Sequence, residues 1–388
     1  MTKPKTIREN GFLLDFQEDI QNLYHHFRYH AHCKVYPTRP LITDKQRFKR
    51  VLFYTPYFDN DIWPRAKLGS SWNLTREDGK ACAHTCVISY NKCDLPFSDA
   101  VIFHEADLFR AHVLKSISIY RNPQQRWVYF THENPQNANH DPSQYNGIFN
   151  WTVTYRRDSD VFYPDGYYRE ILSPDEIPKN HVTTNYAEPK DKLIVWAASH
   201  CGLLRDDVVH KIAHFLPLTV IGRCAKLFNQ KTPNFCKRGS NDCSSFLRRF
   251  KFYLAFENAM CTDYITEKYW ETPFDNNMVP IVLGSNYDFK VAIPGSYINI
   301  LDFQNIEALV KYIEYLDRND TAYNEYFQWK TKYTRIEPGE KSWTCQLCAN
   351  IYNDSLPKKV YTNLGTYWGI DSNCNRSLES MIRSIIRE

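Results

Sequence analysis

Residues 251–284 read KFYLAFENAMCTDYITEKYWETPFDNNMVPIVLG, and this stretch decides the fold. The aromatic-rich run at residues 252–256 and the apolar run at residues 278–283 have the length and composition of buried strands. Between them, Thr266 can cap a helix whose first turn holds Glu267 and Lys268. A strand, a helix and a second strand in about thirty residues form a βαβ unit with parallel strands. The stretch therefore predicts an α/β fold.

Polar side chains follow the first of these two strands. Sheets of this kind bind ligands outside the carboxyl ends of their strands. We therefore expect a small-molecule site at one edge of the sheet, formed by Glu257, Asn258, Tyr264, Glu267 and Lys268. On sequence alone, Glu267 and Lys268 could equally be ordinary solvated charges at a helix start.

The same segment carries a family resemblance. FYLAFENAMCTDYITEK closely resembles the FYLxFENSxxxDYITEK segment of the inverting α1,3-fucosyltransferases, which use GDP-fucose and have the GT-B fold. Other blocks resemble that family in the same order along the chain: VIFHEAD (101–107), NWTVTYRRDSD (150–160), DKLIVWAASHCGLLRDDVV (191–209) with TVIGRC (219–224), and Cys345-Gln346-Leu347-Cys348.

The resemblance implies two Rossmann-like α/β domains that face each other across a cleft. We expect the chain to divide into an N-terminal extension (1–44), an acceptor-side domain (45–180), a GDP-fucose-binding domain (181–355) and a C-terminal tail (356–388). A chain of 388 residues fits two domains better than one core. The formal net charge of +4 gives no basic field for nucleic acid.

The resemblance also assigns donor-binding residues. It implies that Arg205, Tyr264, Glu267 and Lys268 contact GDP-fucose, and that the same rim is lined by Ser199, Glu257 and Asn258. Departure of GDP leaves negative charge on the β-phosphate, which preorganised cations stabilise. The sequence has neither a P-loop nor a Gly-x-Gly-x-x-Gly motif, so side chains and helix ends must hold the phosphates.

A base must take the proton from the acceptor hydroxyl, because an alcohol is a weak nucleophile. Residues 125–135, QRWVYFTHENP, resemble the family segment QRWVxxxxESP, whose glutamate is the base, and this implies that role for Glu133. Asn134 stands where the family has serine. Glu133 could instead be a loop carboxylate that caps a turn, and His132 is a second candidate base because it titrates nearest neutrality.

A required metal is not expected. Asp158-Ser159-Asp160 looks like the metal-binding Asp-x-Asp of other glycosyltransferases. In the family that the chain resembles, this segment holds no required metal, and the adjacent Arg156-Arg157 suggests an ion-pair network instead.

Cysteines and sequons indicate an oxidising compartment. The chain has 12 cysteines, and its Asn-x-Ser/Thr sequons begin at Asn73, Asn150, Asn319, Asn353 and Asn375. A zinc site would have to combine Cys82 and Cys86 with Cys345 and Cys348, about 260 residues away, which is far from a compact zinc-ribbon spacing. The resemblance implies disulfides instead, in which Cys86 and one of Cys82 or Cys93 pair with Cys348 and Cys345.

The resemblance further implies the Golgi lumen, where family members are held by an N-terminal anchor. The longest apolar run, residues 193–198, is too short to span a bilayer, and no signal peptide is visible. We therefore expect either a form without the anchor or an incomplete chain.

The most specific function that the sequence supports is transfer of L-fucose from GDP-fucose to O3 of an N-acetylglucosamine in a glycan. The segments SHC, GRC and LAFEN look more like the branch that modifies the N-glycan core than the Lewis-type branch, which acts on terminal lactosamine. A silent glycan-binding relative is the other possibility, because the loop between Ser199 and Arg205 is shorter than in the family pattern.

Overall fold

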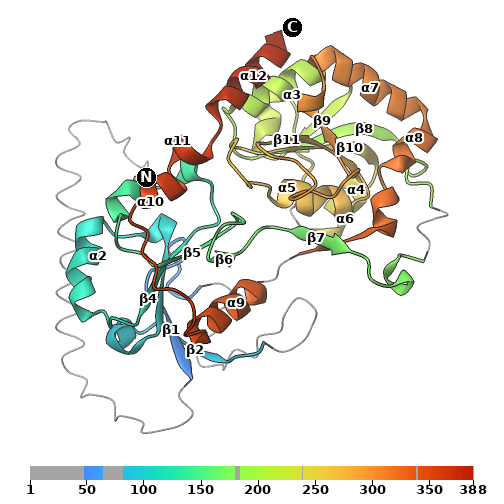
Figure 1. Cartoon of the computed structure of the whole chain (residues 1–388). Coiled ribbons are helices and arrows are strands. Elements are labelled where there is room, and N and C mark those ends of the chain that lie inside the picture. The colour runs from blue at the N-terminus through green and yellow to red at the C-terminus, as the bar shows by residue number, and fades with distance from the viewer. Residues whose placement is uncertain (1–47, 64–81, 180–183, 238, 338–339, 388) are drawn as a thin grey trace, which may run out of the picture. The chain divides into compact units, whose positions relative to one another are not determined.

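The computed structural model describes residues 48–63, 82–179, 184–237, 239–337 and 340–387 (Figure 1). The expected N-terminal extension at residues 1–44 and the sequon at Asn73 lie outside the described residues. No described helix is long and apolar enough to cross a membrane.

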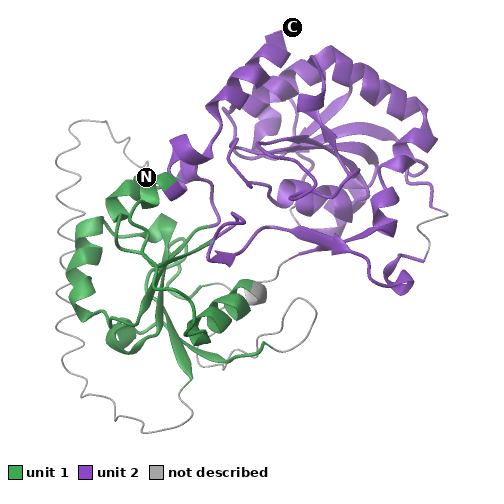
Figure 2. Ribbon diagram, in the orientation of Figure 1, with its two compact units in different colours: residues 1–131, 138–153, 340–366 green, residues 132–137, 154–339, 367–388 purple. Residues whose placement is uncertain are grey.

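The chain forms two compact units, each built from discontinuous segments (Figure 2). Unit 1 takes its described residues from 1–131, 138–153 and 340–366, and unit 2 from 132–137, 154–339 and 367–388. This division differs from the sequence-based boundaries at residues 180 and 355. Residues 154–179 belong to unit 2, and the C-terminal segment is shared between the units.

Unit 1 is a Rossmann-like parallel sheet with helices (Figure 1). Its strands follow the order β2-β1-β3-β4-β5, and every pair runs parallel. Its helices and strands are β1 (Lys49–Phe53), β2 (Cys86–Ser89), β3 (Ala100–His104), α2 (Ala111–Ile117), β4 (Arg126–Phe130), β5 (Trp151–Thr154), α9 (Glu340–Tyr352) and α10 (Leu364–Trp368), which ends just past the boundary.

Two disulfides hold the C-terminal part of unit 1 in place. Cys82 is bonded to Cys345 and Cys86 to Cys348, so that α9 is attached to the segment that enters β2. Cys93 is also disulfide-bonded. These bonds explain why residues 340–355, which were expected at the end of the GDP-fucose-binding domain, belong to unit 1.

Asn150, one of the expected glycosylation sites, lies in the interior of unit 1. Its side chain is buried, its Oδ1 accepts a hydrogen bond from the Trp127 N–H at 2.8 Å, and its Nδ2 donates to the carbonyl of Lys359 at 2.7 Å. A glycan on that nitrogen would break the second bond and has no room. Asn353 and Asn375 are exposed, whereas Asn319 is half-buried and caps a helix.

Unit 2 contains the second parallel sheet, in the order β12-β11-β10-β8-β9. The βαβ unit read from residues 251–284 is confirmed, because β10 and β11 pair in parallel from Phe252 with Val279 to Phe256 with Leu283. The sheet segment consists of β8 (Lys192–Ala197), α3 (Leu204–Phe215), β9 (Leu218–Ile221), α4 (Asn241–Leu247), β10 (Phe250–Phe256), α5 (Glu267–Trp270), α6 (Thr272–Asp275), β11 (Val279–Leu283) and β12 (Ile298–Asn299).

Helices cover both faces of this sheet, as expected for a doubly wound fold (Figure 1). One core lies under α3, α7 and α12 and includes Val209, Leu309 and Ile382, while the other lies under α4, α5 and α6. The remaining helices and strands of unit 2 are β6 (Val161–Phe162), β7 (Tyr167–Glu170), α7 (Ile306–Arg318), α8 (Asp320–Glu325), β13 (Tyr333–Ile336), α11 (Ile370–Asn373) and α12 (Arg376–Arg387). The expectation of two Rossmann-like α/β units is thereby confirmed.

The disulfides of unit 1 provide a test of stability. Cys82–Cys345 and Cys86–Cys348 close nearly the same loop, with sequence separations of 263 and 262 residues. Replacing all four cysteines with alanine should therefore lower the free energy of unfolding by about 5 kcal/mol, because the unfolded chain regains the entropy of that loop. Replacing one pair alone should cost much less, because the other pair keeps the loop closed.

The matched control is the Cys236–Cys243 bond of unit 2, with a separation of 7 residues. Its loss should cost about 2 kcal/mol. Thermal unfolding of the three variants measures the difference. Equal losses from the long-loop double pair and the short-loop pair would contradict the loop-entropy explanation.

Candidate active site

The donor-side crevice of unit 2 lies where the order of its strands reverses. The chain passes from β8 to β9 on one side and then crosses to β10 on the other side of β8. Ligands of open α/β sheets bind outside the carboxyl ends of the strands at such a switch point. Ser199 lies just beyond β8, Arg205 in the first turn of α3, and Glu257 directly after β10. These three expected donor residues therefore lie at the same edge of the sheet, where the donor crevice is expected.

Gly222 allows the strand ends to approach closely on the β9 side. Its φ is +88°, and a Cβ at this position would lie 2.3 Å from the carbonyl oxygen of Ala198. Ser199 Oγ accepts a bond from the Arg223 N–H at 3.4 Å, and the Cys201–Cys224 disulfide joins the two loops. This side of the crevice is built from backbone and covalent contacts.

Arg205 has a different setting from the one expected of a phosphate ligand. Its buried guanidinium donates from Nη1 to the carbonyl of Phe256 at 2.7 Å and from Nη2 to the carbonyl of His200 at 2.9 Å. Burial lowers the pKa of Arg205, while the nearby Glu257 opposes that effect. The side chain thus fixes the ends of β8 and β10 to each other, and direct donor contact by Arg205 stays a prediction.

Glu257 and Lys268 form a buried ion pair at the carboxyl end of β10. Lys268 Nζ lies 3.2 Å from Glu257 Oε2 and 3.7 Å from Glu267 Oε1, and it donates to Thr266 Oγ1 at 2.7 Å. The Glu257 carboxylate also accepts from the Thr266 N–H at 2.8 Å and from Thr266 Oγ1 at 2.9 Å. One carboxylate therefore fixes both the cap of α5 and its lysine.

The charges in this cluster stabilise one another. Burial raises the pKa of Glu257, and Lys268 opposes that rise. Burial also disfavours the charged form of Lys268, but Glu257 and Glu267 outweigh it and raise the pKa of Lys268 above its ordinary value. Lys268 is accordingly a permanent cation at neutral pH, with 18% of its side chain exposed. It can act as a point charge for a phosphate oxygen.

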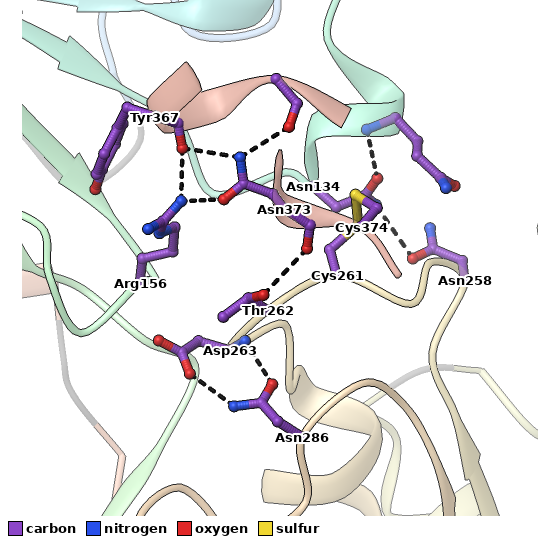
Figure 3. Close-up of a disulfide and its surroundings, with 12 residues drawn as sticks. Asn134, Arg156, Asn258, Cys261, Thr262, Asp263, Asn286, Tyr367, Asn373 and Cys374 are labelled. Carbon is purple, nitrogen blue, oxygen red and sulfur yellow. Dashed lines mark hydrogen bonds between the residues drawn. A yellow bond between two sulfur atoms is a disulfide. The ribbon is translucent and has the colours of Figure 1, made fainter. Parts of the chain in front are cut away.

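The segment that carries Glu133 belongs to unit 2 and is bonded to the loop after β10. Glu133 Oε2 accepts from Asn137 Nδ2 at 2.9 Å. The buried Asn134 donates from Nδ2 to Asn258 Oδ1 at 3.3 Å (Figure 3) and also hydrogen-bonds with the Tyr264 side chain. Asn134 thus connects the candidate base to the donor loop.

One ring nitrogen of His132 is engaged in a hydrogen bond to the backbone. Its Nε2 donates to the carbonyl of Tyr163 at 2.8 Å, and the ring stacks on that of Tyr163 with centroids 4.4 Å apart. Only Nδ1 is then available as a proton acceptor.

The structure brings Glu133 into the neighbourhood of Tyr264 and Glu257. Burial is the main cause that raises the pKa of Tyr264, and the carboxylates of Glu257 and Glu133 raise this pKa further.

The donor loop, residues 257–266, is held on its outer side by the C-terminal segment (Figure 3). Cys261 is bonded to Cys374, and the carbonyl of Asn373 accepts from the Thr262 N–H at 2.7 Å. Asn373 Oδ1 in turn accepts from the Arg156 guanidinium, which also donates to the carbonyl of Tyr367 at 2.5 Å. The loop is therefore positioned by residues more than a hundred positions away in the sequence.

Asp263 in this loop has a left-handed backbone conformation, with φ of +59°. Asn286 Nδ2 donates to its carboxylate at 2.8 Å, and Asn286 Oδ1 accepts from the Asp263 N–H at 2.7 Å (Figure 3). Arg157 lies 3.2 Å from the same carboxylate, and Arg156 forms an ion pair with Asp158 at 2.5 Å. Among the described residues no cluster of histidine, cysteine or acidic side chains has metal-binding geometry.

Sequence reasoning missed two residues of the site. The sequence predicts Thr266 as a helix cap but not its hydrogen bonds to Glu257, because these depend on how the loop folds back onto the strand. Asp165 lies in electrostatic contact with Glu257, Glu267, Lys268 and His132, and burial raises its pKa to about 6. Its only sequence signal is a carboxylate shortly after the short run Val161–Phe162.

Comparisons with known proteins agree on one family. A family model described as Fucosyltransferase, N-terminal, matches residues 46–166, and Glycosyltransferase family 10 (fucosyltransferase) C-term matches residues 187–368. The chain is 30% identical to Alpha-(1,3)-fucosyltransferase fut-5 of Caenorhabditis elegans over 348 residues, which cover 86% of each chain.

The chain is also similar to two further proteins. The chain is 34% identical to 4-galactosyl-N-acetylglucosaminide 3-alpha-L-fucosyltransferase FUT5 of Hylobates lar, over 72% of this chain and 71% of that one. A solved structure titled "Crystal Structure of alpha1,3-Fucosyltransferase" is 16% identical and covers 83% of this chain and 94% of its own, with a TM-score of 0.48.

Asp165 generates a prediction for the pH dependence of stability. Because its pKa is raised from 3.8 to about 6, the folded state holds a proton that the unfolded state releases. The contribution of Asp165 to the free energy of unfolding is therefore largest below about pH 4, and it is lost as the pH rises to about 6. Asp165→Asn removes the loss, so its stability relative to the parent should rise across that interval, by about 2 kcal/mol.

Urea unfolding of Asp165→Asn and of the exposed control Asp354→Asn at several pH values measures this effect. If the difference in unfolding free energy between Asp165→Asn and the parent protein stays constant from about pH 4 to about pH 7, the pKa of Asp165 is not raised in the folded state.

Proposed function

Because this chain belongs to the glycosyltransferase family 10 fucosyltransferases, we propose that it transfers L-fucose from GDP-fucose to O3 of an N-acetylglucosamine in a glycan. The observation that carries the proposal is the buried Glu257–Lys268 pair at the switch-point crevice, next to the segment of Glu133. The pair supplies a fixed cation for a leaving diphosphate, and Glu133 supplies a carboxylate for the proton; these are the two requirements of the reaction.

The reaction is proposed as a single inverting displacement. Glu133 accepts the proton of the acceptor O3 as that oxygen forms a bond to the anomeric carbon of fucose. The bond from this carbon to the β-phosphate oxygen breaks on the opposite face, and GDP leaves with the electron pair. Lys268 stabilises the charge that develops on the β-phosphate. Arg205 keeps the crevice in shape through Phe256 and His200, and its guanidinium is the second candidate cation.

The remaining donor contacts follow from the crevice. Ser199, Glu257, Asn258, Tyr264 and Glu267 are proposed to line the GDP-fucose site, and no metal is proposed as a requirement. Glu257 is fully buried and bonded to Thr266 and Lys268, so its proposed contribution to the site is to position these two residues.

The acceptor is proposed to be the N-glycan core, on the resemblance of the segments SHC, GRC and LAFEN. The relative from Hylobates lar is named for 4-galactosyl-N-acetylglucosaminide, which makes terminal lactosamine the second candidate. Incubation with GDP-fucose and a panel of defined core and antennal glycans distinguishes them. A Golgi lumenal location is proposed as well, supported by the disulfides of both units.

A glycan-binding protein without turnover is the alternative class. The Ser199–Arg205 loop favours it, since the Arg205 guanidinium is engaged with protein carbonyls. Hydrolysis or transfer from GDP-fucose by the purified chain decides between the two, because a silent binder would release no GDP.

Glu133→Gln tests the base. Glutamine keeps the shape and the bond to Asn137 but cannot take the proton, so kcat should fall by about 10² or more while GDP affinity stays the same. The exposed Glu188→Gln is the matched control. Should Glu133→Gln turn over normally, the base is another group, with His132 next in line.

Lys268→Ala tests the cation, with Lys268→Arg as the charge-conserving partner and the exposed Lys226→Ala as control. Loss of the charge should lower the rate with GDP-fucose by about 10²–10³. Because Lys268→Ala leaves Glu257 buried without its cation, a double variant, Lys268→Met with Glu257→Gln, removes both charges and should fold. Full donor use by this double variant would contradict the role of Lys268.

A further inference from the structure

Unit 2 contains a cavity that the proposed reaction does not use. It has a volume of about 340 Å³ and is lined by residues from three segments, 155–170, 263–270 and 290–291. Aromatic rings form much of its wall, namely those of Tyr155, Phe162, Tyr167, Tyr168 and Trp270. Its size is at the small end of ligand cavities, about 300–1,000 Å³, which suits one or two rings.

The cavity lies apart from the donor crevice. None of its lining residues comes from β8, β9 or α3, which form the switch point between β8 and β10. On α5, Lys268 reaches Glu257, whereas Trp270 lines the cavity. Residues two positions apart on a helix do not face the same side. The helix α5 therefore separates the diphosphate site from the cavity.

The floor of the cavity is rigid. Trp270 is 1% exposed and Tyr155 is 2% exposed, and the Tyr155 ring packs on Tyr264 with centroids 5.1 Å apart. Gly166 passes directly over Trp270, where a Cβ would lie 2.4 Å from the indole ring. A side chain at this position would displace the tryptophan, so the Gly166 backbone packs directly on the indole and Trp270 supports the floor from below.

The rim of the cavity is polar. It carries Arg157, Arg169, Glu170, Asp263 and Lys290, all of which are exposed except Asp263. A pyranose ring has apolar C–H faces and an equatorial belt of hydroxyl groups. Aromatic walls accept the faces, while charged groups at the rim give strong hydrogen bonds to the hydroxyls. Sugar is therefore a better match for this cavity than a purely apolar ligand.

We propose that this cavity is a second carbohydrate subsite, which holds one pyranose residue of the acceptor glycan away from the reacting hydroxyl. The inference rests on the proposed function. Two of the three lining segments continue into the donor site: Gly166 follows Asp165, Asp263 and Ile265 flank Tyr264, and Trp270 lies two residues after Lys268. A sugar bound here would steady both segments, so that remote binding energy supports the transfer step.

The test compares a long and a short acceptor. Tyr167→Ala removes a half-buried wall, Val291→Trp fills the cavity from its edge, and Tyr315→Ala on α7 removes an exposed tyrosine elsewhere as the control. With a biantennary N-glycan as acceptor, kcat/KM should fall about tenfold in the two cavity variants. With a methyl glycoside of N-acetylglucosamine it should stay unchanged, as should GDP affinity.

Saturation-transfer NMR on the intact chain with GDP and the same N-glycan gives a readout that needs no turnover. Signals from one sugar residue should be lost in Val291→Trp and kept in Tyr315→Ala. If the parent protein transfers no fucose but shows this pattern, the proposed function fails and the subsite stands. Weaker GDP binding in the cavity variants, equal loss with both acceptors, or unchanged signals in Val291→Trp would each overturn the subsite.

Discussion

The site depends on one buried carboxylate. Glu257 directly follows the central strand β10 and has no solvent exposure, and a charge in that position is costly unless it is paired and hydrogen-bonded. Its partners come from nine and eleven residues later, Thr266 and Lys268, so the intervening loop must fold back onto the strand end. The start of α5, the orientation of its lysine and the course of the donor loop all follow from this requirement.

The same cluster has an unusual charge balance. Lys268 faces Glu257 and Glu267, and Asp165 is within reach of all three. Before a donor arrives, the lysine is thus neutralised by the protein, and a diphosphate must compete with carboxylates for it. The half-protonated state of Asp165 near pH 6 is one way in which the protein limits this excess of negative charge.

The sequence predicted those parts of the fold that depend on short-range patterns. The strand at residues 252–256 and the helix cap at Thr266 both appear, because such local patterns are set by neighbouring residues. The family resemblance singled out Glu133, whose segment lies beside the donor loop. It gave no indication that Asn134 makes the contact with Asn258. Arg205 shows the opposite case, since its partners are backbone carbonyls that no side-chain pattern can reveal. The boundaries at residues 180 and 355 differ from the units because disulfides and long-range pairing, rather than composition, decide where a segment belongs.

The Cys261–Cys374 bond has a consequence for biosynthesis. The cysteine of the donor loop leaves the ribosome 113 residues before its partner, and for that interval its thiol is open to earlier cysteines such as Cys201 and Cys224. Unit 2 can form its sheet during translation, but its ligand-binding loop cannot reach its final geometry until the last helices have emerged. Correct pairing is therefore a late, quality-determining step, and a nascent chain released early would carry a folded sheet with an unfinished site.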